Sequence, residues 1–251
     1  MTDLRALVRT PLLRDSPLSP YRGNATARRS HHPHSVLISD GPDENFIAVF
    51  GPLQMSEFLT LTDEFFGAQG FEVVIESDTA AGVEADLVAA GWSCVEEEIA
   101  MALTPLPQAP APPPGLRVET VAASAAYDDY MRVTPGNRAW VPNLAAATDP
   151  NVALFVGYTA GVPVTTARLT CYGDVAEITG VQTLPAYRRR GYGRALTWAA
   201  ISEAAARACR AVTLTASEMG YPLYLQMGFQ EVCNYRAYER PQMNGADVTE
   251  G

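Results

Sequence analysis

The segment 181–194, with the sequence VQTLPAYRRRGYGR, constrains the fold of this 251-residue chain more than any other part. An apolar, extended run stops at Pro185, and an alanine- and leucine-rich helical pattern begins at Arg194. Between them lie three consecutive arginines and the pair Gly191 and Gly193. The segment therefore predicts a strand, a tight turn and a helix N-terminus. Such a turn gathers backbone N–H groups, a helix dipole and arginine side chains around one point, which suits an anion such as a diphosphate.

Two common phosphate-binding motifs do not fit this turn. A P-loop requires Gly-Lys-Ser/Thr, whereas arginine and alanine follow Gly193, and the chain contains no lysine. A dinucleotide-binding fingerprint requires a third glycine where Leu196 stands. The remaining pattern is Arg188-x-x-Gly191-x-Gly193. On this segment alone, an ordinary strand–helix turn stays open as an alternative.

The chain after the turn supplies a second motif. It predicts a helix, a buried strand and a final strand, over residues 194–207, 211–216 and 232–238. Before the final strand stand Leu223-Tyr224 and Gly228-Phe229. Both motifs together resemble the GNAT superfamily of N-acetyltransferases, whose acyl-CoA signature is Gln/Arg-x-x-Gly-x-Gly/Ala. The resemblance covers roughly residues 116–240. It implies an α/β fold of the α+β type, in which helices flank a mixed central sheet.

The resemblance implies acetyl-CoA, or another short acyl-CoA, as co-substrate and the primary amine of a small molecule or peptide as acceptor. By the same resemblance, one strand pairs with the pantetheine arm and main-chain amides of the glycine turn hold the diphosphate. The cofactor-binding residues implied in this way are Val181, Gln182, Thr183, Arg188, Arg189, Arg190, Gly191, Tyr192, Gly193, Arg194 and Ser217. Ser217 stands where many relatives carry asparagine, which gives its hydrogen bond a shorter reach.

Two catalytic residues are implied as well. Tyr224 matches the tyrosine of the Leu-Tyr motif, and an ordinary pKa of about 10 keeps it protonated and able to donate to the departing thiolate. A tyrosine that only packs is the alternative. Glu177 lies on the strand leading to Thr183, where some relatives carry a catalytic glutamate that accepts the amine proton. A glutamate on a sheet face paired with arginine is the alternative, since a pKa of about 4.3 makes a weak base.

The acceptor pocket is expected to be lined from the segment after Leu116. Its candidates are Tyr127, Tyr130, Trp140 and Asp149. Tyr127 and Tyr130 at helical spacing fit a core equally well, whereas Trp140 stands in a loop and fits a pocket better. From a different class, a catalytically silent acyl-CoA-binding sensor or scaffold stays open as the function.

Composition excludes several partners. A net charge of −10 disfavours nucleic acid, and no apolar run is long enough to span a bilayer. With no signal-peptide core at the N-terminus, we expect a cytoplasmic protein with no membrane partner, and a homodimer stays open. The four cysteines lie among apolar neighbours and are expected to be buried free thiols. The histidines, all within 31–34, have no acidic or cysteine partner nearby, so no metal site is expected.

A proline-rich stretch divides the chain. The expected parts are an irregular N-terminal segment, a degenerate GNAT-like half, a linker, the catalytic domain and a tail, over residues 1–34, 35–104, 105–115, 116–240 and 241–251. The first half predicts helices over 55–66 and 81–90 and strands over 35–39, 46–50, 71–76 and 95–103. Its end, with Gly91-Trp92 before a strand, mirrors Gly228-Phe229, which favours an internal duplication over coincidence. Only Gly51-Pro52 precedes its first helix, so this half is not expected to bind a diphosphate.

Overall fold

The chain forms two compact units, and each combines two separate stretches of sequence. The computed structural model describes all residues except 1, 15, 18–27, 42–43, 135–142 and 241–251. Unit 1 comprises residues 1–27 and 99–232, and unit 2 comprises residues 28–98 and 233–251.

Unit 1 is a mixed sheet with helices on both faces. Its own elements are α1 (Leu4–Leu13), β6 (Leu116–Thr120), α4 (Ser124–Val133), the 3-10 helix η2 (Leu144–Thr148), β7 (Val152–Thr159), β8 (Val162–Tyr172), β9 (Val175–Thr183), the 3-10 helix η3 (Pro185–Tyr187), α5 (Tyr192–Ala206), β10 (Ala211–Ala216) and α6 (Tyr221–Gln226). The strand order is β10-β9-β8-β7-β6, and β9 pairs with β10 in parallel while the other pairs are antiparallel. A parallel pair requires a crossover connection, and α5 provides it.

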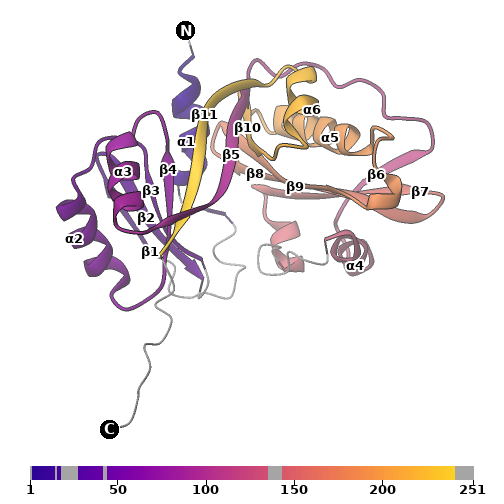
Figure 1. The fold of residues 1–251 in the computed structure, drawn as a ribbon. Helices are drawn as coiled ribbons and strands as arrows, with labels where there is room; N and C mark the ends of the chain where they lie inside the picture. The colour runs from indigo at the N-terminus through magenta and orange to yellow at the C-terminus, as the bar shows by residue number, and fades with distance from the viewer. Residues whose placement is uncertain (1, 15, 18–27, 42–43, 135–142, 241–251) are drawn as a thin grey trace. The chain divides into compact units, whose positions relative to one another are not determined.

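The two faces of this sheet carry different helices, as Figure 1 shows for α5 and α4. On the α5 face, Leu196 and Ile201 are buried in one cluster with Ile178 of β9. On the other face, Tyr130 of α4 is buried in a second cluster with Leu154 of β7. Because side chains alternate along a strand, neighbouring residues of β9 therefore face different helices.

Unit 2 repeats the order of elements found in unit 1. Its elements are β1 (Arg28–His32), β2 (Ser35–Gly41), β3 (Glu44–Val49), α2 (Met55–Phe66), β4 (Glu72–Glu76) and α3 (Ala81–Ala89). The strands β1-β2-β3-β4 pair antiparallel, antiparallel and parallel, as β7-β8-β9-β10 do. α2 connects the parallel pair, as α5 does in unit 1. The repeated pairing pattern is what a duplication predicts, and the helices expected over 55–66 and 81–90 are confirmed.

Each unit is completed by a strand that begins in the other one. β5 (Ser93–Leu103) follows α3, and its residues Ile99–Leu103 pair with β10 of unit 1. β11 (Gln230–Glu239) follows α6, and its residues 235–238 pair with β4 of unit 2. The unit boundaries therefore fall inside strands, unlike the boundaries expected at 104 and 116. The segment 105–115 contains no helix or strand, as expected, but it lies within unit 1.

The N-terminal segment is more regular than expected. Residues 1–34 contain α1 and β1, so the expectation of an irregular segment is wrong for these two stretches. The Asp3 carboxylate accepts the backbone N–H groups of Arg5 and Ala6 at 3.0 and 3.3 Å, which caps α1. Leu7 and Val8 are buried and hold the helix in unit 1. Pro11 lies inside this helix, and its presence obscured the helical pattern.

A partly buried charge network links β11 to α3 within unit 2. The Tyr238 hydroxyl and the Arg236 guanidinium donate to Glu84 Oε1 at 2.6 and 2.8 Å. The Glu84 side chain is only 16% exposed. Burial raises the pKa of Glu84, but the hydrogen bonds from Tyr238 and Arg236 outweigh it, so the net effect lowers this pKa.

We predict that Glu84→Gln lowers the free energy of unfolding at pH 7 by about 1–3 kcal/mol, because a charge-assisted network is lost. A lowered folded-state pKa stabilises the fold above the unfolded pKa of about 4.3, and this stabilisation disappears as the pH falls through the folded value. Urea unfolding should therefore separate the two proteins at pH 7 and bring them together at low pH. Asp86→Asn, an exposed charge change on the same helix, is the control. An equal difference at both pH values would contradict the prediction.

Candidate functional site

The site arises where β9 separates from β10. Their paired residues run from Val175 with Ala211 to Glu177 with Thr213, and β9 continues to Thr183. Gly180, at φ +60°, lies where two residues of β9 oppose one of β8, which defines a β-bulge. A bulge bends its strand, so the end of β9 turns away from β10 and leaves an opening. In unit 2, β3 stays paired with β4 up to its last residue.

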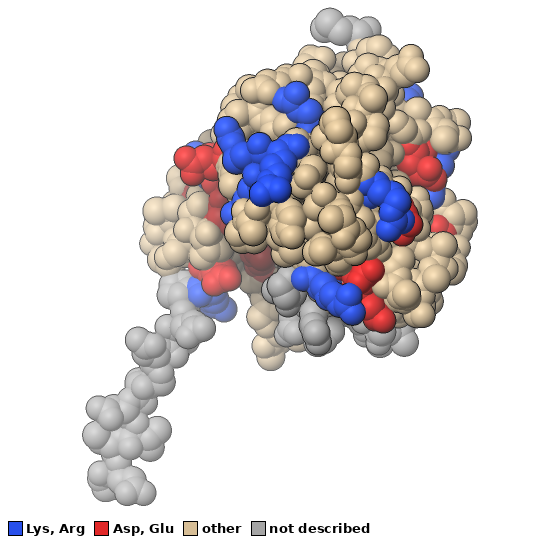
Figure 2. Space-filling model, turned by 90° about the vertical axis from the view of Figure 1, so that its right-hand side faces the viewer, with Lys and Arg blue, Asp and Glu red and all other residues tan. Residues whose placement is uncertain are grey.

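A pocket of about 1120 Å³ occupies this opening. Its walls come from β9, the turn after it, the start of α5, the turn after β10, and α6, with one residue from α4. The lining residues are Val133, Val181, Gln182, Thr183, Leu184, Pro185, Tyr187, Arg188, Arg189, Gly191, Tyr192, Gly193, Arg194, Ser217, Met219, Gly220, Pro222, Leu223, Tyr224 and Gln226. None of these described residues is acidic, although the chain carries a net charge of −10. Figure 2 likewise shows arginine side chains gathered on the face drawn there.

The N-terminus of α5 forms the floor of the pocket at the arginine turn. Gly191 is the N-cap residue at φ +80°, and Arg189 before it is also left-handed at φ +63°. The first intrahelical bond runs from the Ala195 N–H to the Gly191 carbonyl at 3.0 Å. The preceding amides, those of Tyr192, Gly193 and Arg194, therefore lack an intrahelical acceptor and suit an anion. The helix begins at Tyr192, two residues earlier than its composition predicts.

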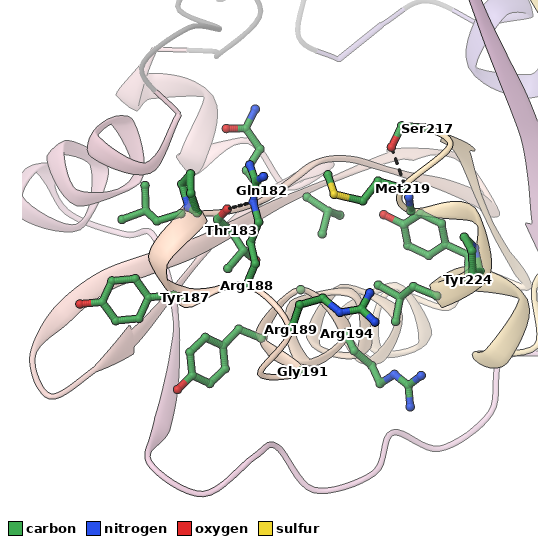
Figure 3. Close-up of a pocket in the computed structure, with 18 of the residues that line it drawn as sticks. Gln182, Thr183, Tyr187, Arg188, Arg189, Gly191, Arg194, Ser217, Met219 and Tyr224 are labelled. Atoms are coloured by element: carbon green, nitrogen blue, oxygen red, sulfur yellow. Dashed lines mark hydrogen bonds between the residues drawn. The ribbon is translucent and has the colours of Figure 1, made fainter.

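The arginines of the turn differ in what they contact. Arg188 donates from Nε to the Thr183 carbonyl at 3.1 Å, which closes the turn (Figure 3). The Arg194 guanidinium donates to the Gln226 side chain and so links α5 to α6. Arg189 has no hydrogen-bond or ion-pair partner among the residues that the structure describes, and it lines the pocket. Arg190, unlike the other three arginines of the turn, does not line the pocket. Its guanidinium carbon lies over the Tyr187 ring, 5.4 Å from the ring centroid.

Tyr224 lies in the opposite wall, on α6. It is 7% exposed, and its ring meets that of Phe229 edge-on at 5.7 Å. Its hydroxyl points into the pocket (Figure 3) and has no hydrogen-bond partner among the described residues. Burial raises the pKa of Tyr224 to about 12. The group is therefore a proton donor throughout the physiological pH range. Ser217, beside it, accepts the Gly220 N–H at 3.4 Å.

Glu177 lies apart from the pocket. It stands on β9 one residue before Ile178 and so on the sheet face opposite α5. The Tyr172 hydroxyl donates to its Oε2 at 3.4 Å. Val181, the first pocket residue of β9, follows Glu177 by four positions, which corresponds to roughly 13 Å along a strand.

Three of the four expected acceptor residues, Tyr127, Tyr130 and Asp149, do not line the pocket. Tyr130 is a core residue, Tyr127 packs against the same cluster, and neither lines the pocket. The Asp149 carboxylate accepts the Asn151 N–H at 2.7 Å and shapes a turn. Trp140 lies outside the described residues. Val133 of α4 contributes to the wall instead.

Sequence reasoning missed several pocket residues. Met219, Pro222, Leu223 and Gln226 belong to the segment that carries Tyr224, so their proximity to the motif was the available signal. No pattern pointed to Val133, because its position depends on how α4 packs.

Within the described residues, no cluster of histidine, cysteine and acidic side chains has the arrangement of a metal site. Cys171, Cys209 and Cys233 are buried free thiols, but Cys94 is exposed, because it stands on the exposed stretch at the start of β5. Among the described helices, none has the length and apolarity needed to cross a membrane.

Comparison with known proteins identifies the domain around this pocket. The sequence model described as acetyltransferase (GNAT) family matches residues 109–229. No curated protein matches the chain in sequence. Among solved structures, a GCN5-related N-acetyltransferase from Kribbella flavida has a TM-score of 0.70 and 20% identity, covering 86% of this chain and 90% of that one.

Two further structures share this fold. A GCN5-related N-acetyltransferase from Sphaerobacter thermophilus has a TM-score of 0.57 and 18% identity, covering 82% of this chain and 80% of that one. A tandem GNAT protein from the clavulanic acid biosynthesis pathway has a TM-score of 0.57 and 13% identity, covering 82% and 78%. Residues 109–229 therefore form a domain of the acetyltransferase (GNAT) family.

Proposed function

We propose that the chain is an N-acetyltransferase that transfers an acyl group, acetyl in the simplest case, from a CoA thioester to a primary amine. One observation carries the proposal: a single pocket joins the start of α5 and its arginines to the hydroxyl of Tyr224, which has no hydrogen-bond partner within the described part of the chain. The first part suits the phosphates of CoA, and the second suits the sulfur of its thioester. The acceptor is a small molecule or a peptide.

The phosphate end of CoA would lie at the arginine turn. The amides of Tyr192, Gly193 and Arg194 supply hydrogen bonds, and the helix dipole adds positive potential. Arg189 supplies a guanidinium for a phosphate oxygen. Val181 to Thr183 would run along the pantetheine arm, since they line the pocket on the strand edge that β10 leaves. Ser217 completes the opposite side.

The chemical step follows from this placement. The amine nitrogen attacks the thioester carbonyl carbon, an N–C bond forms and the C–S bond breaks. The departing thiolate takes the proton of the Tyr224 hydroxyl, which solvent replaces. We propose Glu177 as the group that finally receives the amine proton. Because it does not line the pocket, bound water would have to carry the proton to it.

A silent acyl-CoA-binding module is the second candidate, because Ser217 departs from the asparagine of many relatives. Two measurements on the purified chain separate the candidates: calorimetric binding of CoA, and release of free thiol from acetyl-CoA with a panel of primary amines. We expect binding together with amine-dependent thiol release. Binding without turnover for any amine would identify the silent module, and no binding would reject both.

We predict that Gly191→Val weakens CoA binding by about tenfold or more. A β-branched residue at φ +80° costs about 1–2 kcal/mol, so the turn would relax and redirect the amides. The new side chain would also approach Pro113, whose Cγ lies 3.5 Å from the position of a Cβ. Gly161→Val is the matched control, because Gly161 has φ +79° in a turn outside the pocket. Equal CoA affinity in the two variants would place the phosphates elsewhere.

We predict that Tyr224→Phe lowers kcat by about 100-fold while the Kd for CoA stays within about twofold, because only the proton donor is removed. With a pKa of about 12, the wild-type hydroxyl stays protonated, so it should cause no loss of rate below about pH 11. Steady-state kinetics between pH 6 and pH 10 check both statements.

Glu177→Gln in the same assay tests the base and should lower kcat without changing CoA affinity. Wild-type kcat in Tyr224→Phe would remove this tyrosine from the mechanism. Wild-type kcat in Glu177→Gln would do the same for the proposed base.

A further inference from the structure

Thr165 is a fully buried hydroxyl beside the pocket edge. It lies on β8 with 0% exposure, and its paired neighbours are Gly157 on β7 and Thr183 on β9. Its Oγ1 lies 2.7 Å from the Gln182 carbonyl oxygen and 2.9 Å from Thr183 Oγ1. Thr165 does not line the pocket, whereas Gln182 and Thr183 both do.

The direction of both hydrogen bonds follows from counting protons. A hydroxyl carries one proton, and a carbonyl oxygen can only accept. Thr165 therefore donates its proton to the Gln182 carbonyl. The bond between the two hydroxyls must then be donated by Thr183. With its proton used, Thr183 Oγ1 has only lone pairs left for a ligand of the pocket that Thr183 lines.

Gly157 fixes the orientation of Thr165. A Cβ at Gly157 would lie 2.6 Å from the Thr165 methyl carbon, so this methyl occupies the space that the glycine leaves. The methyl and the hydroxyl share one carbon, and a β-branched side chain has few allowed rotamers. Seating the methyl over β7 therefore directs the hydroxyl toward β9.

An acceptor at Thr183 selects which part of a ligand lies beside it. Phosphate oxygens are acceptors, so an acceptor-only hydroxyl gives them no hydrogen bond. The pantetheine arm of CoA carries two amide N–H donors, which match it. We propose that Thr165 is a positioning residue, which sets the Thr183 hydroxyl as the acceptor for an amide N–H of the pantetheine arm. The proposal rests on the proposed acyl-CoA function and adds a residue outside the pocket to it.

The test compares two ligands by calorimetry: CoA, and adenosine 3′,5′-bisphosphate, which has phosphates but no pantetheine arm. Thr183→Val and Thr165→Val should each weaken the binding of CoA by about fivefold, which is the range expected for the loss of one hydrogen bond. The affinity for the bisphosphate should stay unchanged. Thr165→Val should raise the KM for acetyl-CoA and leave kcat within about twofold. Thr165→Ser keeps the hydroxyl and should restore most of the affinity.

A double-mutant cycle tests whether Thr165 acts through Thr183. In the Thr183→Val background, the substitution Thr165→Val should produce no further loss of CoA affinity. Thr62→Val is the matched control: Thr62 is a buried threonine of α2 whose hydroxyl donates to the Phe58 carbonyl at 2.9 Å. It should leave the affinity for both ligands unchanged.

Several outcomes overturn the proposal. Wild-type CoA affinity in folded Thr165→Val does so, and so does an equal loss for both ligands, which would indicate general distortion. A loss that persists in the Thr183→Val background also overturns it. If Thr165→Val does not fold, the CoA affinity of Thr183→Val decides, because the half-buried side chain of Thr183 belongs to a residue that lines the pocket. Wild-type CoA affinity in Thr183→Val would then overturn the proposal. Absence of CoA binding in the wild type is a different result, since it rejects the proposed function itself.

Discussion

The separation of β9 from β10 is the constraint on which the rest of this site depends. A paired strand has its backbone groups satisfied by its neighbour and offers no edge to a ligand. The pairing of β9 with β10 ends at Glu177, and the bulge at Gly180 then bends β9 while it is still paired with β8, so a polar strand edge is exposed in a cavity. The same bend places the end of β9 against the start of α5. Strand edge and helix terminus thus belong to one cavity because one strand leaves its partner.

The two units differ at the place where unit 1 has its pocket. Both contain a parallel pair of strands joined by a helix. In unit 2, β3 stays paired with β4 through Val49, and no arginine-rich turn precedes α2, which begins after Gln54. The duplicated order of elements is therefore not enough to form this pocket, and unit 1 adds the bulge and the Gly191 turn. Unit 2 instead receives β11, whose Arg236 and Tyr238 hold Glu84.

The sequence predicts the pocket side of unit 1 well because its determinants are local. Gly191 at a left-handed N-cap and Tyr224 after a short turn depend on their near neighbours, and the structure brings both to one cavity. The acceptor side depends on packing between distant segments, so Tyr127 and Tyr130 lie in or against a core instead. The sequence does not predict the exchange of β5 and β11 either, because the alternation of side chains along each strand is the same whichever unit the strand joins. The proposed role of Thr165 depends on its side-chain rotamer and on the direction of its hydrogen bonds, and neither can be predicted from a pattern of residue types.

The ionisable groups of the pocket restrict how its chemistry can depend on pH. Every basic side chain among the described lining residues is arginine, a residue type that keeps its charge at physiological pH in proteins. Tyr224 has a pKa of about 12 and keeps its proton. No described lining residue is acidic, and none is histidine. In the proposed reaction, a change of rate near neutral pH would therefore come from the amine itself or from a group outside the pocket, such as Glu177. An amine acceptor is mostly protonated at pH 7, and its neutral form alone can attack. The pH dependence of turnover thus reports the acceptor side, which is the side that the sequence leaves least defined.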